Sequence, residues 1–465
     1  MKRTVALVFV VSAAVVGLVL AWYAVRQDRE FRRLIALGDA SLAREQTYVA
    51  IEAFSGALAL RPDSMVAHLK RGDTYRRRGE LSAALRDLRD ASGLDPSATR
   101  PLELLGDVNV ALGRYQRATE HYRRFITLDD RSPRVLYKLA LAYHRFGQAA
   151  SAIDPLRQAV AIDDRFVEAH YLLGLCLRAR ARVDEAQRAL TKAISLNPAF
   201  SAAREELADL YMSIGRPRDG IEQLEALAAI EPARAERMVS VGLAYARMGR
   251  TETAILTLGR AAERYAEEPA VYTALGRIWL ESAELRNDRV ALSKALEALQ
   301  PTAGRAAAGS ETLALYGRAL FLSGDAEGAE RTLQLATTRF PVEPVAFRYL
   351  SAAAERLGHQ RAARDALINY VSLSSDGDDA RTLAAQIADL SLRMEDAVTA
   401  LNWAARAVEG ENPDAFSLGL LADAQWRASH ENEARVTLAQ ALARDPGNRT
   451  LLRLEQRFRV ERRQP

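Results

Sequence analysis

The sequence predicts an all-α protein, built as a right-handed superhelical solenoid of about twelve stacked helix pairs. Three observations favour this fold. Small residues recur every 34 positions, helix formers such as Ala, Leu, Arg and Glu dominate the composition, and glycines and prolines recur at fixed places instead of clustering. A chain of 465 residues is too long for one globular core, and a repeat array accounts for its length without one.

The first expected element is an apolar helix over residues 5–25, which contains no charged residue. About 20 apolar residues span a bilayer as a helix, and Trp22 and Tyr23 stand where aromatic rings favour the membrane interface. We therefore expect a single N-terminal transmembrane helix within residues 1–29 and a single-pass protein of the cell membrane. The alternative is a cleaved signal peptide with a weak cleavage site at residues 19–21, although the apolar run is long for one.

The charges on the two sides of this segment predict opposite membrane orientations. Lys2 and Arg3 precede it, as in an export signal, which would send the repeats out of the cytoplasm. The arginines behind it outnumber these two and favour the opposite orientation: Arg26, Arg29, Arg32 and Arg33. We expect the repeat domain on the periplasmic or extracytoplasmic side.

Seven helix pairs are predicted over residues 30–268 from series of small residues that keep one period. The first series falls in the first helix of each pair and consists of Gly38, Gly72, Gly106, Ala140, Gly174, Ala208, Gly242 and Gly276. The second series falls in the second helix and consists of Ala50, Ala84, Ala118, Ala152, Ala186, Gly220 and Ala254. Small side chains at both places allow the two helices of a pair to approach closely.

Glycines and prolines mark the expected helix ends. A glycine turns the chain between the two helices of a pair at Gly79, Gly113, Gly147, Gly215 and Gly249. A proline follows the second helix at Pro62, Pro96, Pro198 and Pro232. One pair cannot bury its own apolar face, so the pairs must stack.

The period slips after Trp279, and we expect an irregular pair and a joint over residues 269–309, punctuated by Pro301. It resumes over residues 310–448, where four more pairs and a loop near residues 374–379 are predicted. The remaining residues, 449–465, read as a polar capping helix and tail.

This pattern resembles the tetratricopeptide repeat family, whose motif matches repeat by repeat from Phe31 to about Glu268. The resemblance implies a scaffold that binds partner proteins, as extended peptides or helices, on a concave face lined by the first helices. Aromatic residues and arginines are typical of binding hot spots. The lining and rim places of the array carry Tyr137, Leu141, Tyr171, Leu175, Arg76, Arg77, Arg145 and Arg178.

We expect no enzyme, cofactor, metal site or small-molecule substrate. None of the six histidines lies three or four residues from another, and His68 and His170 occupy a packing place of the repeat. Cys176, the single cysteine, falls among leucines and reads as a buried, inert thiol. Nucleic acid is not an expected partner, because the net charge is only +4 and bases alternate with acids.

The sequence therefore favours a membrane-anchored, non-catalytic scaffold. One alternative is a regulatory adaptor that faces the cytoplasm at the inner membrane. It resembles the lipopolysaccharide-assembly regulators, but the C-x-x-C module of those proteins is missing here. The other is an accessory subunit of an envelope enzyme complex.

Overall fold

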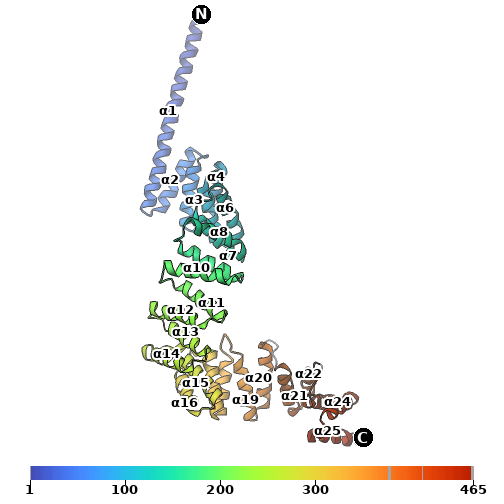
Figure 1. The fold of residues 1–465 in the computed structure, drawn as a ribbon. Coiled ribbons are helices and arrows are strands. Elements are labelled where there is room, and N and C mark those ends of the chain that lie inside the picture. The colour runs from blue at the N-terminus through green and yellow to red at the C-terminus, as the bar shows by residue number, and fades with distance from the viewer. Residues whose placement is uncertain (1, 375–378, 411, 462–465) are drawn as a thin grey trace. The chain divides into compact units, whose positions relative to one another are not determined.

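The computed structural model describes residues 2–374, 379–410 and 412–461, with side chains from Val15 to Val460 within these ranges. These residues form twenty-five α-helices and no strand, which confirms the all-α prediction. The chain forms two compact units, residues 1–230 and 231–465 (Figure 1). Most of the loop expected near residues 374–379, and the expected tail at residues 462–465, lie outside the described residues.

Each unit is a succession of antiparallel helix pairs. The first unit contains α1 (Lys2–Ala43), α2 (Thr47–Leu60), α3 (Met65–Arg77), α4 (Leu81–Leu94), α5 (Thr99–Ala111), α6 (Tyr115–Leu128), α7 (Pro133–Arg145), α8 (Ala149–Ile162), α9 (Val167–Ala179), α10 (Val183–Leu196), α11 (Ser201–Ser213) and α12 (Pro217–Ile230). The second unit contains α13 (Ala235–Arg247), α14 (Thr251–Arg264), α15 (Pro269–Arg286), α16 (Arg289–Ala303), α17 (Ser310–Ser323), α18 (Ala326–Ala336), α19 (Val345–Arg356), α20 (Gln360–Leu373), α21 (Ala380–Arg393), α22 (Ala397–Ala407), α23 (Ala415–Arg427), α24 (Glu431–Arg444) and α25 (Arg449–Glu461).

The predicted transmembrane helix, and with it the single-pass membrane localisation, is wrong. Among the helices whose side chains are described, none combines the length and the apolar character needed to cross a bilayer. The described part of α1 is apolar from Val15 only to Val25, and charged residues follow at once in the same helix. The helix continues without a break to Ala43, and its C-terminal part packs beside α2 (Figure 1).

Small residues bring the helices of a pair together, as the sequence predicts. The glycine of the first helix faces a large side chain of the second, so that Gly72 contacts Leu88 and Gly106 contacts Tyr122. A Cβ atom on Gly106 would lie only 2.3 Å from Cε1 of Tyr122, which explains why this place excludes larger residues. Alanines of the second series, such as Ala84, are fully buried against the partner helix.

In each of these turns between paired helices, one residue has a left-handed backbone conformation with positive φ. Gly79, Gly113, Gly147, Gly215 and Gly249 have φ angles of 79°, 69°, 80°, 73° and 72°. The N–H of the residue after the glycine donates back to a carbonyl of the last helical turn, as in the 2.9 Å hydrogen bond from Glu80 N to the Tyr75 carbonyl. Ala181 holds the same place after α9 with a φ of 55°, although it carries a Cβ atom.

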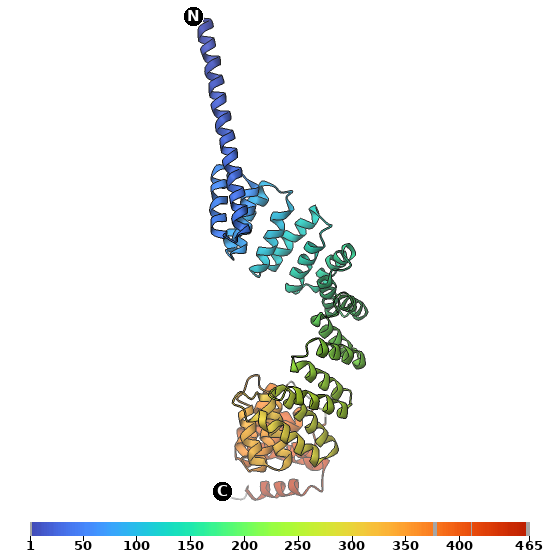
Figure 2. The ribbon, with the colours of Figure 1, turned by 90° about the vertical axis from the view of Figure 1, so that its left-hand side faces the viewer.

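The first helices line the inner side of each unit. Helix α7 packs against α9 and α9 against α11, and in the second unit α21 packs against α23. Among the described residues, no comparable packing joins one even-numbered helix to the next. The odd-numbered helices therefore lie closer together, and each stack curves around them. Figure 2 shows the successive pairs from the side.

The irregular pair, α15 and α16, differs from the prediction in its helix length and in where its second helix ends. Helix α15 has 18 residues where α13 has 13, and Gly276 contacts Leu299 of α16. This partner lies 23 positions later, instead of the 16 that separate Gly106 from Tyr122. Pro301 lies inside α16 and does not end it; the helix ends at Ala303. At the C-terminus, α25 packs on α23 through stacked rings of Trp426 and Phe458, whose centroids are 4.0 Å apart.

Candidate protein-binding surface

Two tyrosines predicted from the sequence occupy equivalent places on the inner side of the first unit. Tyr137 lies on α7 and packs against Phe166, with ring centroids 5.1 Å apart, and Tyr171 lies on α9 and packs against Phe200 at 5.0 Å. Phe166 and Phe200 themselves are spaced by 34 residues, so the repeat period already contained them as a signal that our sequence analysis missed.

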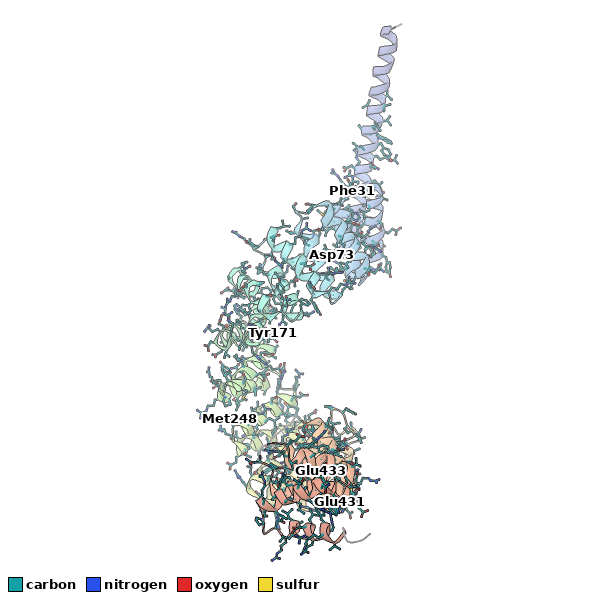
Figure 3. All side chains as sticks on the ribbon, turned by 90° about the vertical axis from the view of Figure 1, so that its right-hand side faces the viewer. Phe31, Asp73, Tyr171, Met248, Glu431 and Glu433 are labelled. Atoms are coloured by element: carbon teal, nitrogen blue, oxygen red, sulfur yellow. The ribbon has the colours of Figure 1, made fainter. Side chains whose placement is uncertain are left out.

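The structure brings the four predicted lining residues together. Tyr137, Leu141, Tyr171 and Leu175 pack on one hydrophobic cluster, and all four stay half-buried (Figure 3 labels Tyr171). Neither tyrosine hydroxyl forms a hydrogen bond with a described residue. We name these four residues the tyrosine patch.

Burial and acidic neighbours raise the pKa of both tyrosine hydroxyls above its ordinary value, at which they are already protonated at neutral pH. Burial, and then the charge of Glu168, raises the pKa of Tyr137. Burial, and then the charges of Glu206 and Glu205, raises the pKa of Tyr171. Both hydroxyl groups can therefore donate hydrogen bonds to a bound molecule at neutral pH.

Three of the four predicted arginines are neutralised within the chain. Arg76 and Arg77 lie 2.6 and 3.1 Å from the carboxylate of Asp73 (labelled in Figure 3), and Arg178 forms an ion pair with Glu206. Helix α3 packs on α2, α4 and α5, so Arg76 and Arg77 do not border the tyrosine patch. Arg145 is exposed and has no ion pair with a described residue.

An ionic cluster borders the tyrosine patch on the α5 side. The Lys138 ammonium lies 2.8 Å from Glu103 Oε1 and 2.8 Å from Asp107 Oδ1, and the Tyr122 hydroxyl donates to Asp107 at 2.7 Å. Burial favours the neutral form of Glu103, but Lys138 and Arg100 outweigh it and hold the pKa of Glu103 below its usual value. This cluster joins α5, α6 and α7 and fixes the wall next to the tyrosine patch.

His68 and His170, which occupy the same packing place in their repeats, have a structural role. His68 Nε2 lies 2.9 Å from the Pro62 carbonyl and His170 Nε2 lies 3.0 Å from the Asp164 carbonyl, so each imidazole caps the preceding turn. His68, Asp87 and Asp90 have spacing that could hold a metal ion. However, Arg71 already binds both oxygens of Asp87 at 2.7 Å, which accounts for this cluster as an ion-pair network between α3 and α4.

Cys176 is buried, as predicted. Its Sγ atom lies 3.7 Å from His144 Nδ1, and burial raises the pKa of the thiol to about 11. A thiol with so high a pKa is protonated at neutral pH and is a weak nucleophile.

Stacked antiparallel pairs, glycine turns and an inner side built from first helices define an α-helical repeat protein. A family model described as the C-terminal domain of cilia and flagella-associated protein 70 matches residues 21–211, and a tetratricopeptide repeat model matches residues 205–269. These matches show that residues 21–269 are similar to tetratricopeptide repeat proteins. Tetratricopeptide repeat proteins generally act as non-catalytic scaffolds in protein–protein interaction.

The chain is similar to the small glutamine-rich tetratricopeptide repeat-containing protein 2 of Mycosarcoma maydis, with 32% identity over 92 residues. The match covers 20% of this chain and 26% of that relative, so the chain spans about a quarter of the relative's length.

Two solved structures match parts of this chain. A crystal structure of MamA is 27% identical, covering 36% of this chain and 96% of MamA with a TM-score of 0.34. The structure of YrrB, described as a TPR protein with an unusual peptide-binding site, is 22% identical, covering 39% of this chain and 94% of YrrB with a TM-score of 0.37. Both TM-scores are low, and no functional conclusion follows from them.

Proposed function

We propose that the chain is a non-catalytic scaffold that holds an extended peptide or a helix of a partner protein on the tyrosine patch. One observation supports this most strongly: two half-buried tyrosines stand side by side on α7 and α9, with both hydroxyls unpaired among the described residues. Tyrosine offers apolar area and a hydrogen-bonding tip at low entropic cost, and it is enriched among the residues that dominate binding energy.

The neighbouring groups define the partner more closely. Leu141 and Leu175 add half-buried apolar surface to the same cluster, so the bound segment presents at least one large apolar side chain. Arg145 is the one predicted rim arginine without an ion pair to a described residue. It favours a partner segment that carries an acidic residue next to its large apolar side chain. In this proposal Arg76, Arg77 and Arg178 stabilise the array and do not contact the partner, because their charges are already satisfied.

The test combines Tyr137→Ala with Tyr171→Ala in the full chain. Partners captured by the wild-type chain are identified, and the bound segment is then measured by calorimetry as a synthetic peptide. We expect the double variant to bind about 30-fold or more weakly, since each hot-spot residue contributes over 1 kcal/mol. Tyr48→Ala is the control, because Tyr48 is exposed on α2, a second helix.

A second variant separates binding from folding. Tyr137→Phe with Tyr171→Phe keeps the contacts to Phe166 and Phe200 and removes only the hydroxyls. We expect an intermediate loss of affinity and an unchanged circular-dichroism melt. If the alanine variant bound the peptide as tightly as the wild-type chain, the tyrosine patch would not be the partner site.

A further inference from the structure

A cavity of about 440 Å³ lies in the second unit, between the first helices α21 and α23 and the terminal helix α25. This volume is in the range of ordinary ligand pockets. Leu392, Leu420, Leu451 and Leu454 supply apolar wall, and Phe416 lines the cavity while 59% exposed, so the cavity opens to solvent beside this ring. Among the described residues, no other aromatic ring packs on Phe416.

In the register of the repeat, the cavity lies where an aromatic pair stands in the first unit. Tyr137 and Tyr171 hold the fifth place of α7 and α9, and each ring packs on the phenylalanine that directly precedes the next first helix. In the last complete pair these two places belong to Gly419, the fifth residue of α23, and Asn448, which directly precedes α25. Both residues line the cavity, so two rings that the first unit has are missing here.

The side chains at these two places are held by other contacts. Asn448 Oδ1 accepts from the Thr450 N–H at 3.0 Å, and Asn448 Nδ2 donates to Asp445 at 2.9 Å, so this amide caps α25. A Cβ atom on Gly419 would lie 2.5 Å from Cδ2 of Leu451, so Leu451 already packs directly against the glycine. The remaining apolar surface is stabilised when a side chain from outside the chain covers it.

Guanidinium groups outnumber carboxylates around the cavity, with four arginines against two aspartates. Both aspartates, Asp389 and Asp423, form ion pairs with arginines of the same lining. Arg453 also lines the cavity, is exposed and has no ion pair with a described residue. The polar part of the lining therefore favours an acidic group of a ligand.

We propose that this cavity binds a peptide segment of a partner protein that carries a phenylalanine or tyrosine next to an acidic residue. The aromatic side chain takes the place of the missing rings beside Gly419 and Asn448 and packs on Phe416, and the carboxylate pairs with Arg453. The site goes beyond the proposed function and is separate from the tyrosine patch, because it belongs to the second unit. A chain with both sites holds two partner segments.

The test measures binding of a short fluorescent peptide to the full chain by fluorescence anisotropy. The peptide has Glu-Phe-Glu at its centre and Gly and Ser elsewhere, and a second peptide has Ala in place of Phe. We expect the phenylalanine peptide to bind about 10-fold or more tightly than the alanine peptide, because burying the ring removes a large apolar area from water.

Phe416→Ala combined with Arg453→Gln should weaken binding of the phenylalanine peptide about 5- to 30-fold. The control combines Phe340→Ala with Arg444→Gln, which changes the net charge equally. Phe340 is 91% exposed, Arg444 is exposed without an ion pair to a described residue, and neither lines the cavity. Both variants should keep the wild-type circular-dichroism melt, because all four side chains are exposed.

A second pair of variants fills the cavity from within the chain. Asn448→Phe supplies the ring that Phe166 provides in the first unit, and it should weaken binding of the phenylalanine peptide about 5-fold or more. Asn448→Ala is its control, because both substitutions remove the cap of α25 and only the phenylalanine fills the space.

The variant with Tyr137→Ala and Tyr171→Ala separates this site from the tyrosine patch, and it should bind the phenylalanine peptide as the wild-type chain does. The proposal is overturned if that variant loses the peptide while the Phe416 and Arg453 variant keeps it, a result that would assign the peptide to the tyrosine patch. It is also overturned by equal weakening in the control, by no preference for the phenylalanine peptide, or by no binding to the wild-type chain. Tighter binding of laurate than of the peptide in this cavity would indicate an anionic amphiphile as the ligand and would equally refute it.

Discussion

Adding one methyl group at Gly106 should destabilise the third helix pair. The new Cβ atom would lie 2.3 Å from Cε1 of Tyr122 and 2.6 Å from Cδ1 and Cζ, which is well inside contact distance. The ring of Tyr122 cannot move aside easily, because it is 1% exposed and its hydroxyl donates to Asp107 at 2.7 Å. Either the ring or the spacing between α5 and α6 must change.

The expected cost follows from two opposing effects. Overpacking a filled core costs about 1–3 kcal/mol, and the anchored ring places Gly106→Ala at the upper end. Alanine in a helix interior gains about 1 kcal/mol over glycine. We therefore expect a net loss of about 2 kcal/mol.

The neighbouring repeat shows how the clash can be relieved. Ala140 occupies the equivalent place and packs in one cluster with Leu156, where the third pair has Tyr122. In a Tyr122→Leu background, Gly106→Ala should therefore cost less than in the wild-type chain, with a coupling energy of about 1 kcal/mol or more. Gly259→Ala in α14 is the control: a Cβ there meets no atom within 4 Å, and the substitution should stabilise the chain.

The assay is urea unfolding followed by circular dichroism, with amide hydrogen exchange in α5 and α6 as the local readout, because repeat arrays need not unfold as one unit. Exchange in α5 and α6 should quicken in Gly106→Ala and return toward wild-type rates in the double variant. An unchanged or higher stability of Gly106→Ala, or equal effects in both backgrounds, would refute the close-packing argument.

Three further predictions concern single residues. Ala181→Gly should raise stability by about 1 kcal/mol in the same urea assay, because Ala181 holds a left-handed conformation that costs a Cβ-bearing residue about 1–2 kcal/mol. Glu103→Gln should destabilise the chain at neutral pH by about 1–3 kcal/mol, because the buried site loses its negative charge and one of the two oxygens that accept from Lys138 and Arg100. Since the pKa of Glu103 is lowered in the folded chain, its contribution is present above the unfolded value of about 4.3 and fades as the pH falls through the folded pKa. The stability of wild-type and Glu103→Gln chains should therefore converge in acid, and parallel curves would contradict this. Cys176 should resist a thiol reagent at neutral pH in the folded chain and react once urea unfolds it; rapid labelling of folded protein would contradict its burial.

The repeat was readable from the sequence because its signals are local and periodic. Glycine lacks a Cβ atom and so allows the left-handed φ of Gly79 and its equivalents at the turns, whereas proline after a second helix fixes φ and cannot donate a backbone hydrogen bond. The period also predicted that Tyr137 and Tyr171 hold equivalent places on first helices, and both pack on one hydrophobic cluster. Sequence pattern gave a wrong prediction for the N-terminal segment. An apolar run does not reveal that its helix continues to Ala43 as the first helix of the repeat array.

Sequence period by itself determined the helices, their turns and which faces they bury. Only the tertiary structure decided which charges remain available, because ion pairing depends on side chains about one repeat apart in sequence, as in Lys138 with Asp107 and Arg178 with Glu206. Arg178 and Arg117 look alike in the sequence, yet Glu206 of the next repeat neutralises Arg178, whereas Arg117 is exposed and has no ion pair with a described residue. Coulomb attraction acts over a few ångströms of space, and the stacking of helices sets those distances.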